Sequence, residues 1–156
     1  MHENAETIRK FYECFGKKDA EGMVALYADD IAFSDPVFPD LKGDEAKAMW
    51  RMLCARAADL EVVASGIEGD ASSGKAHWDA TYTFSATGRK VLNRIDARFT
   101  FRDGKIATHT DTFDLWKWTR MALGFKGTLL GWSPIVRNAV RKQADKGLRI
   151  FMKKGA

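Results

Sequence analysis

The sequence predicts an α+β fold in which helices cover one face of a curved antiparallel sheet. Two observations carry this prediction. Apolar residues recur at helical spacing through the first third of the chain, and strands with alternating apolar and polar residues follow. Helices first and a meander of strands afterwards is typical of a domain whose helices gather on one side of the sheet.

Composition is consistent with a single domain of this class. The chain has 156 residues, of which 46% are hydrophobic, enough to form a core. Cys14 and Cys54 lie in helical patterns without metal-site spacing, which favours a reduced protein. The polar first ten residues indicate no secretory signal, and no apolar run is long enough to span a membrane. We therefore expect a cytoplasmic protein.

Three helices are expected before the sheet. The apolar stripe of the first consists of Ile8, Phe11, Tyr12 and Phe15. That helix should end near Gly16, and Asp19 is a suitable N-cap for a short second helix. We expect Asp29-Asp30 to close this second helix. Asp44 can cap the third, which carries Trp50 on its buried stripe.

Strands should occupy most of the middle of the chain. A short strand is expected at 31–35, followed by a loop that Pro36 and Pro39 punctuate. Longer strands are expected at 60–67 and 76–84. On the second of these, one face carries Trp78, Ala80, Tyr82 and Phe84.

The stretch 91–116 predicts the central hairpin. Asp103-Gly104 is a strong two-residue turn signal, because Gly accepts the positive φ that a type I′ turn needs. The apolar face of the first strand consists of Val91, Asn93, Ile95, Ala97, Phe99 and Phe101. The matching face of the second consists of Ala107, His109, Asp111 and Phe113. A His and an Asp on a covered face need partners, because unpaired buried polar groups cost free energy.

These motifs resemble a known family. LYADDIAFSDP (26–36), FTFRDGKI (99–106) and DTFDLW (111–116) are similar to stretches of the nuclear transport factor 2-like superfamily, which includes ketosteroid isomerase, limonene epoxide hydrolase and SnoaL-type polyketide cyclases. The resemblance covers roughly residues 5–116. It implies a cone-shaped, partly mixed sheet wrapped over three N-terminal helices, with a hydrophobic pocket between them. It also implies a homodimer.

The resemblance to the isomerase is incomplete. Asp35 occupies the position of its general base. Its two oxyanion donors fall on Phe11 and Ala97, which cannot donate a side-chain hydrogen bond. Steroid isomerase activity is therefore not expected.

The resemblance to the epoxide hydrolase is also incomplete. Its final-strand Asp resembles Asp111, whereas its other two site positions fall on Trp78 and Ala80. A slip of one residue would offer His77 and Asp79 instead, but it would move every side chain to the other face of the sheet. We therefore expect His77 and Asp79 on the outer face.

What remains is a predicted acid/base site without metal or cofactor, formed by Asp35, His109 and Asp111. Burial should raise the pKa of Asp35 towards the range useful for proton abstraction. The expected ligand-binding side chains are Trp50, Trp78, Tyr82, Phe99 and Phe113. The chemistry would suit an isomerase, cyclase or hydrolase acting on a small hydrophobic molecule. A non-catalytic binding module or a structural polar cluster is the alternative.

The chain beyond the family-like domain (1–116) predicts a helical, basic extension (117–156). Residues 115–156 carry 10 Lys and Arg against 1 Asp and Glu. Its apolar residues, among them Leu129, Leu130 and Trp132, require cover. We expect the extension to pack on the domain, as a lid for example, or on a partner subunit. Contact with an anionic membrane ranks lower, and nucleic-acid binding ranks last.

Overall fold

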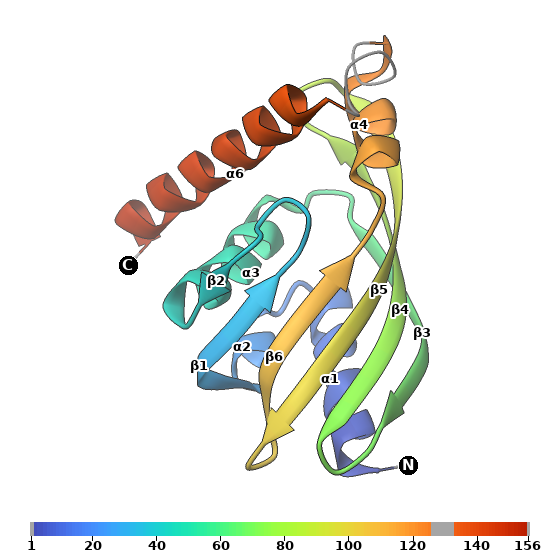
Figure 1. Ribbon diagram of the computed structural model, residues 1–156, viewed down its shortest axis with the longest axis vertical. Helices are drawn as coiled ribbons and strands as arrows, with labels where there is room; N and C mark the ends of the chain where they lie inside the picture. The colour runs from blue at the N-terminus through green and yellow to red at the C-terminus, as the bar shows by residue number, and fades with distance from the viewer. Residues whose placement is uncertain (1, 126–132, 156) are drawn as a thin grey trace.

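The structure is a computed structural model that describes residues 2–125 and 133–155. In chain order its elements are α1 (Glu3–Gly16), α2 (Ala20–Val24), β1 (Tyr27–Ser34), β2 (Leu41–Lys42), α3 (Asp44–Arg56), β3 (Glu61–Gly69), β4 (Ser73–Phe84), β5 (Arg89–Arg102), β6 (Lys105–Thr112), α4 (Leu115–Leu123) and α6 (Pro134–Gly155). Figure 1 shows them as one curved sheet with helices against it.

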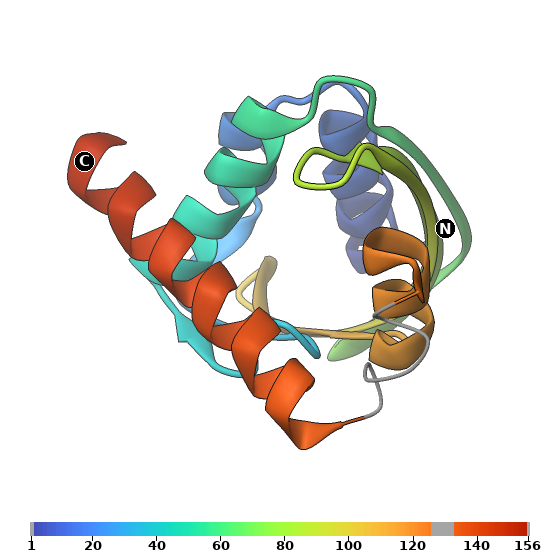
Figure 2. The same ribbon diagram turned by 90° about the horizontal axis from the view of Figure 1, so that it is seen from above.

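The sheet has six strands in the order β2-β1-β6-β5-β4-β3. The pairs are antiparallel except for β1 and β6, which run parallel. The sheet curls around α1, α2 and α3, as the view from above shows (Figure 2). The predicted α+β fold, with a curved mixed sheet over three N-terminal helices and a C-terminal helical extension, is confirmed.

Helix α1 forms where its apolar stripe predicts it, and that stripe packs against the sheet. Ile8 and Phe11 are fully buried. Two glycines let the helix approach closely: a Cβ on Gly69 would lie 2.6 Å from the Ala5 amide, and one on Gly74 would lie 2.5 Å from Ile8 Cδ1. At these two positions α1 comes close to the sheet because no side chain stands between them.

Two predicted helix boundaries are wrong. Asp29 and Asp30 do not close α2 but lie within β1, which begins at Tyr27. There they are exposed and form ion pairs, Asp30 with Arg102 and Asp29 with Lys47. Asp44 is the first residue of α3 rather than its cap, because Gly43 takes the N-cap position with a φ of 53°.

The central hairpin forms as predicted, with one irregularity. Asp103 and Gly104 both have positive φ, 54° and 78°, as a type I′ turn requires. The β5–β6 register shifts between Thr100 and Phe101. The shift breaks the predicted alternation: Ile106 is fully buried, whereas Ala107, expected on the inner face, is only half-buried.

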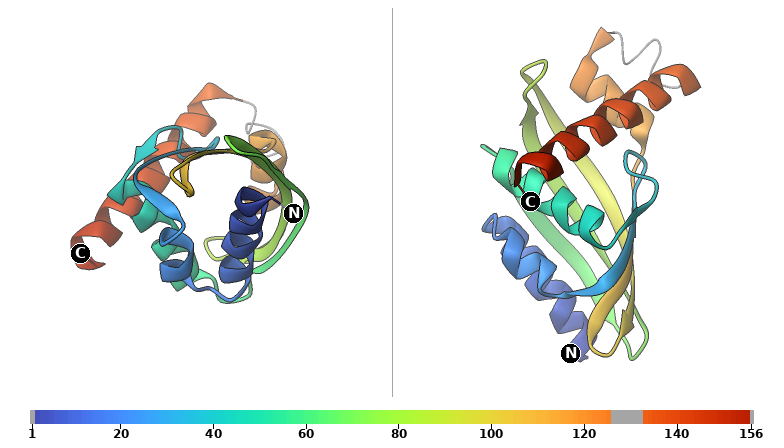
Figure 3. Two further views of the ribbon diagram at one scale, coloured as in Figure 1. Left: turned by 90° about the horizontal axis from the view of Figure 1, so that it is seen from below. Right: turned by 90° about the vertical axis from the view of Figure 1, so that its left-hand side faces the viewer.

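The C-terminal helices pack on the domain in the described part of the chain. Helix α4 contacts β5, and α6 lies beside α3 and the β1–β2 connection (Figure 3). Leu148 of α6 is fully buried, and Arg149 forms an ion pair with Glu45 at 2.6 Å. Leu129, Leu130 and Trp132 lie outside the described residues. None of the helices that the structure describes is both long and apolar enough to cross a membrane.

Candidate functional site

His109 and Asp111 form a pair on the inner face of β6. Their side chains are 0% and 3% exposed, and His109 Nε2 lies 2.8 Å from Asp111 Oδ1. The register places them within the sheet rather than at its edge: His109 is opposite Phe99 of β5 and Phe33 of β1. Both predicted side chains therefore point into the core.

A chain of hydrogen bonds leads to Asp111. Trp50 Nε1 donates to the hydroxyl of Tyr27 at 2.8 Å, and that hydroxyl lies 2.7 Å from His109 Nδ1. Because the Tyr27 oxygen already accepts from an indole N–H, its own proton is free to donate to His109 Nδ1. His109 Nε2 then carries the proton that it donates to Asp111. The hydrogen bonds therefore run in one direction, from Trp50 through Tyr27 and His109 to Asp111.

Aromatic rings fix the position of the imidazole. The ring centroid of Phe99 lies 4.3 Å from that of His109, and Phe33, Phe11 and Trp50 follow at 5.1, 5.5 and 5.9 Å. With both nitrogens bonded and every side packed, His109 has no free atom for a ligand. It can orient Asp111, and it keeps Asp111 supplied with a charge-assisted hydrogen bond.

Asp35 follows β1 and is half-buried in the loop before β2. Its Oδ1 accepts hydrogen bonds from the amides of Val37, at 2.7 Å, and Phe38, at 2.6 Å. Burial nevertheless raises the pKa of Asp35 from 3.8 to about 7, and the negative charge of Asp111 adds to the rise. The two amides and the positive charge of Arg141 oppose it. Asp35 is thus poised to exchange a proton near neutral pH.

Tyr82 and Trp118 form a second hydrogen-bonded pair near Asp35. Trp118 Nε1 of α4 donates to the Tyr82 hydroxyl at 2.7 Å. Burial raises the pKa of Tyr82, the Trp118 bond opposes this, and the charge of Asp35 adds to the rise. The Trp118–Tyr82 hydrogen bond therefore joins α4 to β4 at a place where the charge of Asp35, in the loop after β1, is still felt by the Tyr82 hydroxyl.

Two buried donors near Asp111 lack partners. Tyr12 and Trp78 are 5% and 6% exposed, and neither the Tyr12 hydroxyl nor Trp78 Nε1 has a hydrogen-bond partner among the described residues. Their ring centroids lie 5.9 Å apart. Burial raises the pKa of Tyr12 well above its ordinary value, and the charge of Asp111 contributes to the rise. Such unpaired donors are uncommon and costly.

The predicted ligand-binding residues have different surroundings. Trp50 and Phe99 are almost fully buried and pack on His109. Trp78 is buried on β4 beside Tyr12, whereas Tyr82 and Phe113 are half-buried. Of the five, Tyr82 and Phe113 are therefore the two that keep partial exposure to solvent.

Several residues of this cluster were not predicted as site residues. Tyr27 lies at the start of β1, where the sequence suggested a helix, and Trp118 and Arg141 come from the C-terminal helices. No strand alternation could have found Tyr27, because the register of β1 shifts between Tyr27 and Ala32, and Asp29, two residues after Tyr27, is exposed.

The outer face of the sheet holds a separate polar group. His77 lies between two carboxylates, with Nδ1 2.9 Å from Asp96 and Nε2 2.8 Å from Asp79. The expectation that His77 and Asp79 face outward is confirmed, because both are partly exposed. In the described ranges, no group of three or more His, Cys, Asp or Glu side chains could hold a metal ion.

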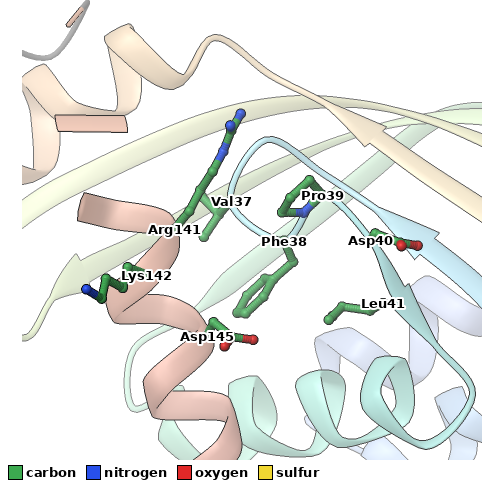
Figure 4. Close-up of a pocket in the computed structure, with 8 residues that line it drawn as sticks. All are labelled: Val37, Phe38, Pro39, Asp40, Leu41, Arg141, Lys142 and Asp145. Atoms are coloured by element: carbon green, nitrogen blue, oxygen red, sulfur yellow. The ribbon is translucent and has the colours of Figure 1, made fainter. Parts of the chain in front are cut away.

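A surface hollow of about 310 Å³ lies between the β1–β2 connection and α6 (Figure 4). Its lining consists of Val37, Phe38, Pro39, Asp40, Leu41, Arg141, Lys142 and Asp145. It shares the loop that holds Asp35. None of the eight predicted site residues lines it.

Comparisons with known proteins give a family and a set of similar folds. The family model for the SnoaL-like domain matches residues 8–109. No curated protein matches the chain significantly.

Three similar solved structures agree on the fold. An NTF2-like protein of unknown function from Burkholderia pseudomallei has 22% identity and a TM-score of 0.69, over 78% of this chain and 98% of that one. TerC, co-crystallised with polyporic acid, has 17% identity and a TM-score of 0.66, over 77% and 98%. An LEH-like epoxide hydrolase of M. tuberculosis has 20% identity and a TM-score of 0.63, over 86% and 95%. At these identities the likeness concerns the fold alone.

Proposed function

The chain belongs to the SnoaL-like family, and from that membership we propose that it is a cofactor-independent acid/base enzyme acting on a small hydrophobic molecule. The reaction class is isomerisation, cyclisation or hydrolysis. The observation that carries the proposal is the setting of Asp35, a half-buried carboxyl that accepts hydrogen bonds from the Val37 and Phe38 amides. Burial and the charge of Asp111 raise its pKa to about 7.

Each predicted acid/base residue has a distinct role in this proposal. Asp35 is the group that takes up and returns a proton, because it is half-buried rather than sealed in the core. The charge of Asp111 raises the pKa of Asp35 and so makes its carboxylate more basic. His109 is a positioning residue, since both of its nitrogens are occupied.

The chemistry follows from the protonation state of Asp35. Above a pH of about 7 the ionised carboxylate takes a proton from a carbon next to a carbonyl group, or from an attacking water. The resulting Asp35 carboxylic acid can return that proton to another atom of the substrate. No cofactor is needed for either step.

Apolar and aromatic walls support the proposed substrate class. Tyr82 and Phe113 are half-buried on the same side of the sheet as Asp111, and Trp78 lies deeper. Such walls suit flat, apolar molecules. The structural neighbour co-crystallised with polyporic acid is in agreement with a ligand of this kind.

A generic proton-abstraction probe tests the proposal without knowledge of the substrate. Nitrobenzisoxazole is a flat apolar molecule whose N–O bond breaks when a base removes its ring proton, giving a coloured cyanophenolate. We expect turnover to rise with pH through about 7. Asp35→Asn should lower it by about 100-fold or more. Asp40→Asn, in the same loop but exposed, is the matched control and should leave it unchanged. Equal rates for the chain and for Asp35→Asn would remove the proposal.

The alternative is a non-catalytic ligand-binding module. The tight packing of Trp50 and Phe99 around His109 favours it, because a histidine enclosed by aromatic rings cannot contact a reacting substrate. Saturable quenching of tryptophan fluorescence by apolar aromatic molecules, without any turnover of the probe, would support this reading.

The division into a domain (1–116) and a packed extension (117–156), the homodimer and the cytoplasmic location are part of the same proposal. The outer sheet face exposes large apolar side chains, Val63 at 65% and Leu92 at 42%. A second copy of the chain could cover them. Peripheral membrane contact by the basic helices ranks below this.

A further inference from the structure

We infer that Arg141 of α6 binds an anionic group of the ligand beside Asp35, so that the preferred ligands are small apolar molecules carrying a carboxylate or similar oxyanion. This inference deepens the proposed function and rests on Asp35 being its reactive group. Arg141 lies outside the part of the chain that the family model matches, so the family does not supply it.

The loop after β1 holds Arg141 and Asp35 together. Arg141 Nε donates to the carbonyl oxygen of Pro36, the residue after Asp35, at 2.8 Å. The amides of Val37 and Phe38 bind the Asp35 carboxyl from the same loop. Figure 4 shows the Arg141 side chain extending from α6 past Val37, away from the ring of Phe38. The guanidinium thus lies at the loop that presents Asp35.

The terminal nitrogens of Arg141 have no partner among the described residues. Its one hydrogen bond uses Nε, and no carboxylate in residues 2–125 or 133–155 forms an ion pair with it. Asp145, one helical turn further on, pairs instead with Arg149 at 3.3 Å. A half-buried guanidinium with both terminal nitrogens free is suited to bidentate binding of a carboxylate.

The surroundings of Asp35 make anion binding depend on its protonation. The charged or titratable groups that act on it are Asp111 from β6, Arg141 from α6 and, in return, Tyr82 from β4. While Asp35 is neutral, Arg141 can bind a ligand anion without repulsion of that anion by the Asp35 carboxyl. Once Asp35 ionises, a second negative charge stands close to the ligand, and anion affinity should fall.

Calorimetric titration with two probes tests this inference. Naphthoate is a flat anion above pH 5, and naphthamide is its neutral counterpart. At pH 6 we expect naphthoate to bind about tenfold more tightly than naphthamide. Arg141→Gln should remove that preference, and Arg141→Lys should restore part of it. Lys146→Gln, which makes the same charge change at an exposed position of α6 outside the lining of the surface hollow, should leave it within about twofold.

The pH dependence provides a second readout that a merely structural role would not produce. In the unaltered chain, naphthoate affinity should fall between pH 6 and pH 8, whereas Asp35→Asn should keep its pH 6 affinity at pH 8. Unchanged naphthoate affinity in Arg141→Gln, an equal loss in Lys146→Gln, or no binding of naphthoate would overturn the inference. Arg141-dependent binding together with unimpaired nitrobenzisoxazole turnover by Asp35→Asn would uphold it and remove the proposed catalytic role.

Discussion

At the scale of single residues, Asp35 combines local stabilisation with electrostatic cost. Two backbone amides bind its carboxyl, which would ordinarily favour the charged form. Burial and the charge of Asp111 outweigh them. A carboxyl whose charged form is destabilised by its surroundings is typical of functional sites, and this destabilisation has a measurable effect on folding.

Asp35 should make the fold less stable as pH rises. Its pKa is about 7 in the folded protein and near 4 when unfolded, so between these values the folded state holds a proton that the unfolded state has lost. Raising the pH through this window should therefore lower the free energy of unfolding. Discounted for partial exposure, the loss is about 1–3 kcal/mol.

Urea unfolding at pH 5 and pH 8 measures this effect. Asp35→Asn keeps the oxygen that accepts from Val37 and Phe38 but cannot ionise, so it should gain stability relative to the unaltered chain at pH 8 and not at pH 5. Asp40→Asn, an exposed neighbour, is the control. A constant difference between Asp35→Asn and the unaltered chain at both pH values would show that Asp35 is ionised throughout.

Tyr27 is the second residue whose role can be isolated. Its hydroxyl is bonded to both Trp50 Nε1 and His109 Nδ1 in the core. Tyr27→Phe leaves two buried groups without a partner and should lower the free energy of unfolding by about 2–4 kcal/mol.

Tyr82→Phe is the matched comparison for this change. It leaves only Trp118 Nε1 without a partner, at a half-buried position, and should cost about 1 kcal/mol. Chemical denaturation of both variants gives the comparison. Equal losses would argue that the Trp50–Tyr27–His109 chain of hydrogen bonds adds nothing to stability.

At the scale of elements, the sequence predicts local features well and contacts between distant segments poorly. The turn at Asp103-Gly104 and the cap at Asp19 follow from short-range conformational preferences, and both form as predicted. The start of α6 has the same kind of local basis: Pro134 is its first residue, and the Ser133 hydroxyl accepts a hydrogen bond from the Ile135 amide. The misplacement of Asp29-Asp30 arose because a polar pair resembles a helix end, although here it faces solvent on a strand.

The candidate site shows the same difference between local features, which the sequence predicts, and contacts between distant segments, which it does not. The inward direction of His109 and Asp111 follows from strand periodicity, which the sequence contains. The hydrogen bonds of Tyr27 to His109 and of Trp118 to Tyr82 do not follow from periodicity, because they join residues 82 and 36 positions apart in the chain. The Arg141–Pro36 contact, 105 positions apart, is likewise visible only in the structure. Tertiary proximity sets these contacts, and no local pattern encodes it.

The packing of α6 on the domain gives a prediction at this scale. Leu148 is fully buried and Ile150, on the same helix, is 42% exposed. Leu148→Ala should lower the free energy of unfolding by about 2–4 kcal/mol, because it leaves a cavity. Ile150→Ala should cost less than about 1 kcal/mol. If thermal and urea unfolding showed both variants to be as stable as the unaltered chain, α6 would not be packed on the domain in solution.

At the scale of the whole molecule, the two faces of the sheet have different roles. The inner face carries the core and the interacting carboxylates, and the outer face combines the His77 cluster with exposed apolar side chains. Helix α6 brings Arg141 and Lys142 next to the loop after β1. This arrangement makes α6 part of the candidate site as well as a cover for α3.

The proposed homodimer is testable on the outer face. Val63→Glu together with Leu92→Glu places charge on two exposed strands without touching the core. Light scattering after size exclusion should show a dimer for the unaltered chain and a monomer for this double variant. Ile135→Glu, equally apolar but on α6 and 81% exposed, should leave the dimer intact. A monomeric unaltered chain would contradict the proposal.

Carbon-detected NMR titration of the Asp35 carboxyl, assigned with Asp35→Asn, addresses the central claim most directly. In the unaltered chain the carboxyl should titrate near pH 7, and in Asp111→Asn, where the neighbouring charge is gone, its midpoint should move down. A midpoint near 4 that is the same in both proteins would mean that Asp35 is an ordinary solvated carboxylate, and the proposed acid/base site would not exist.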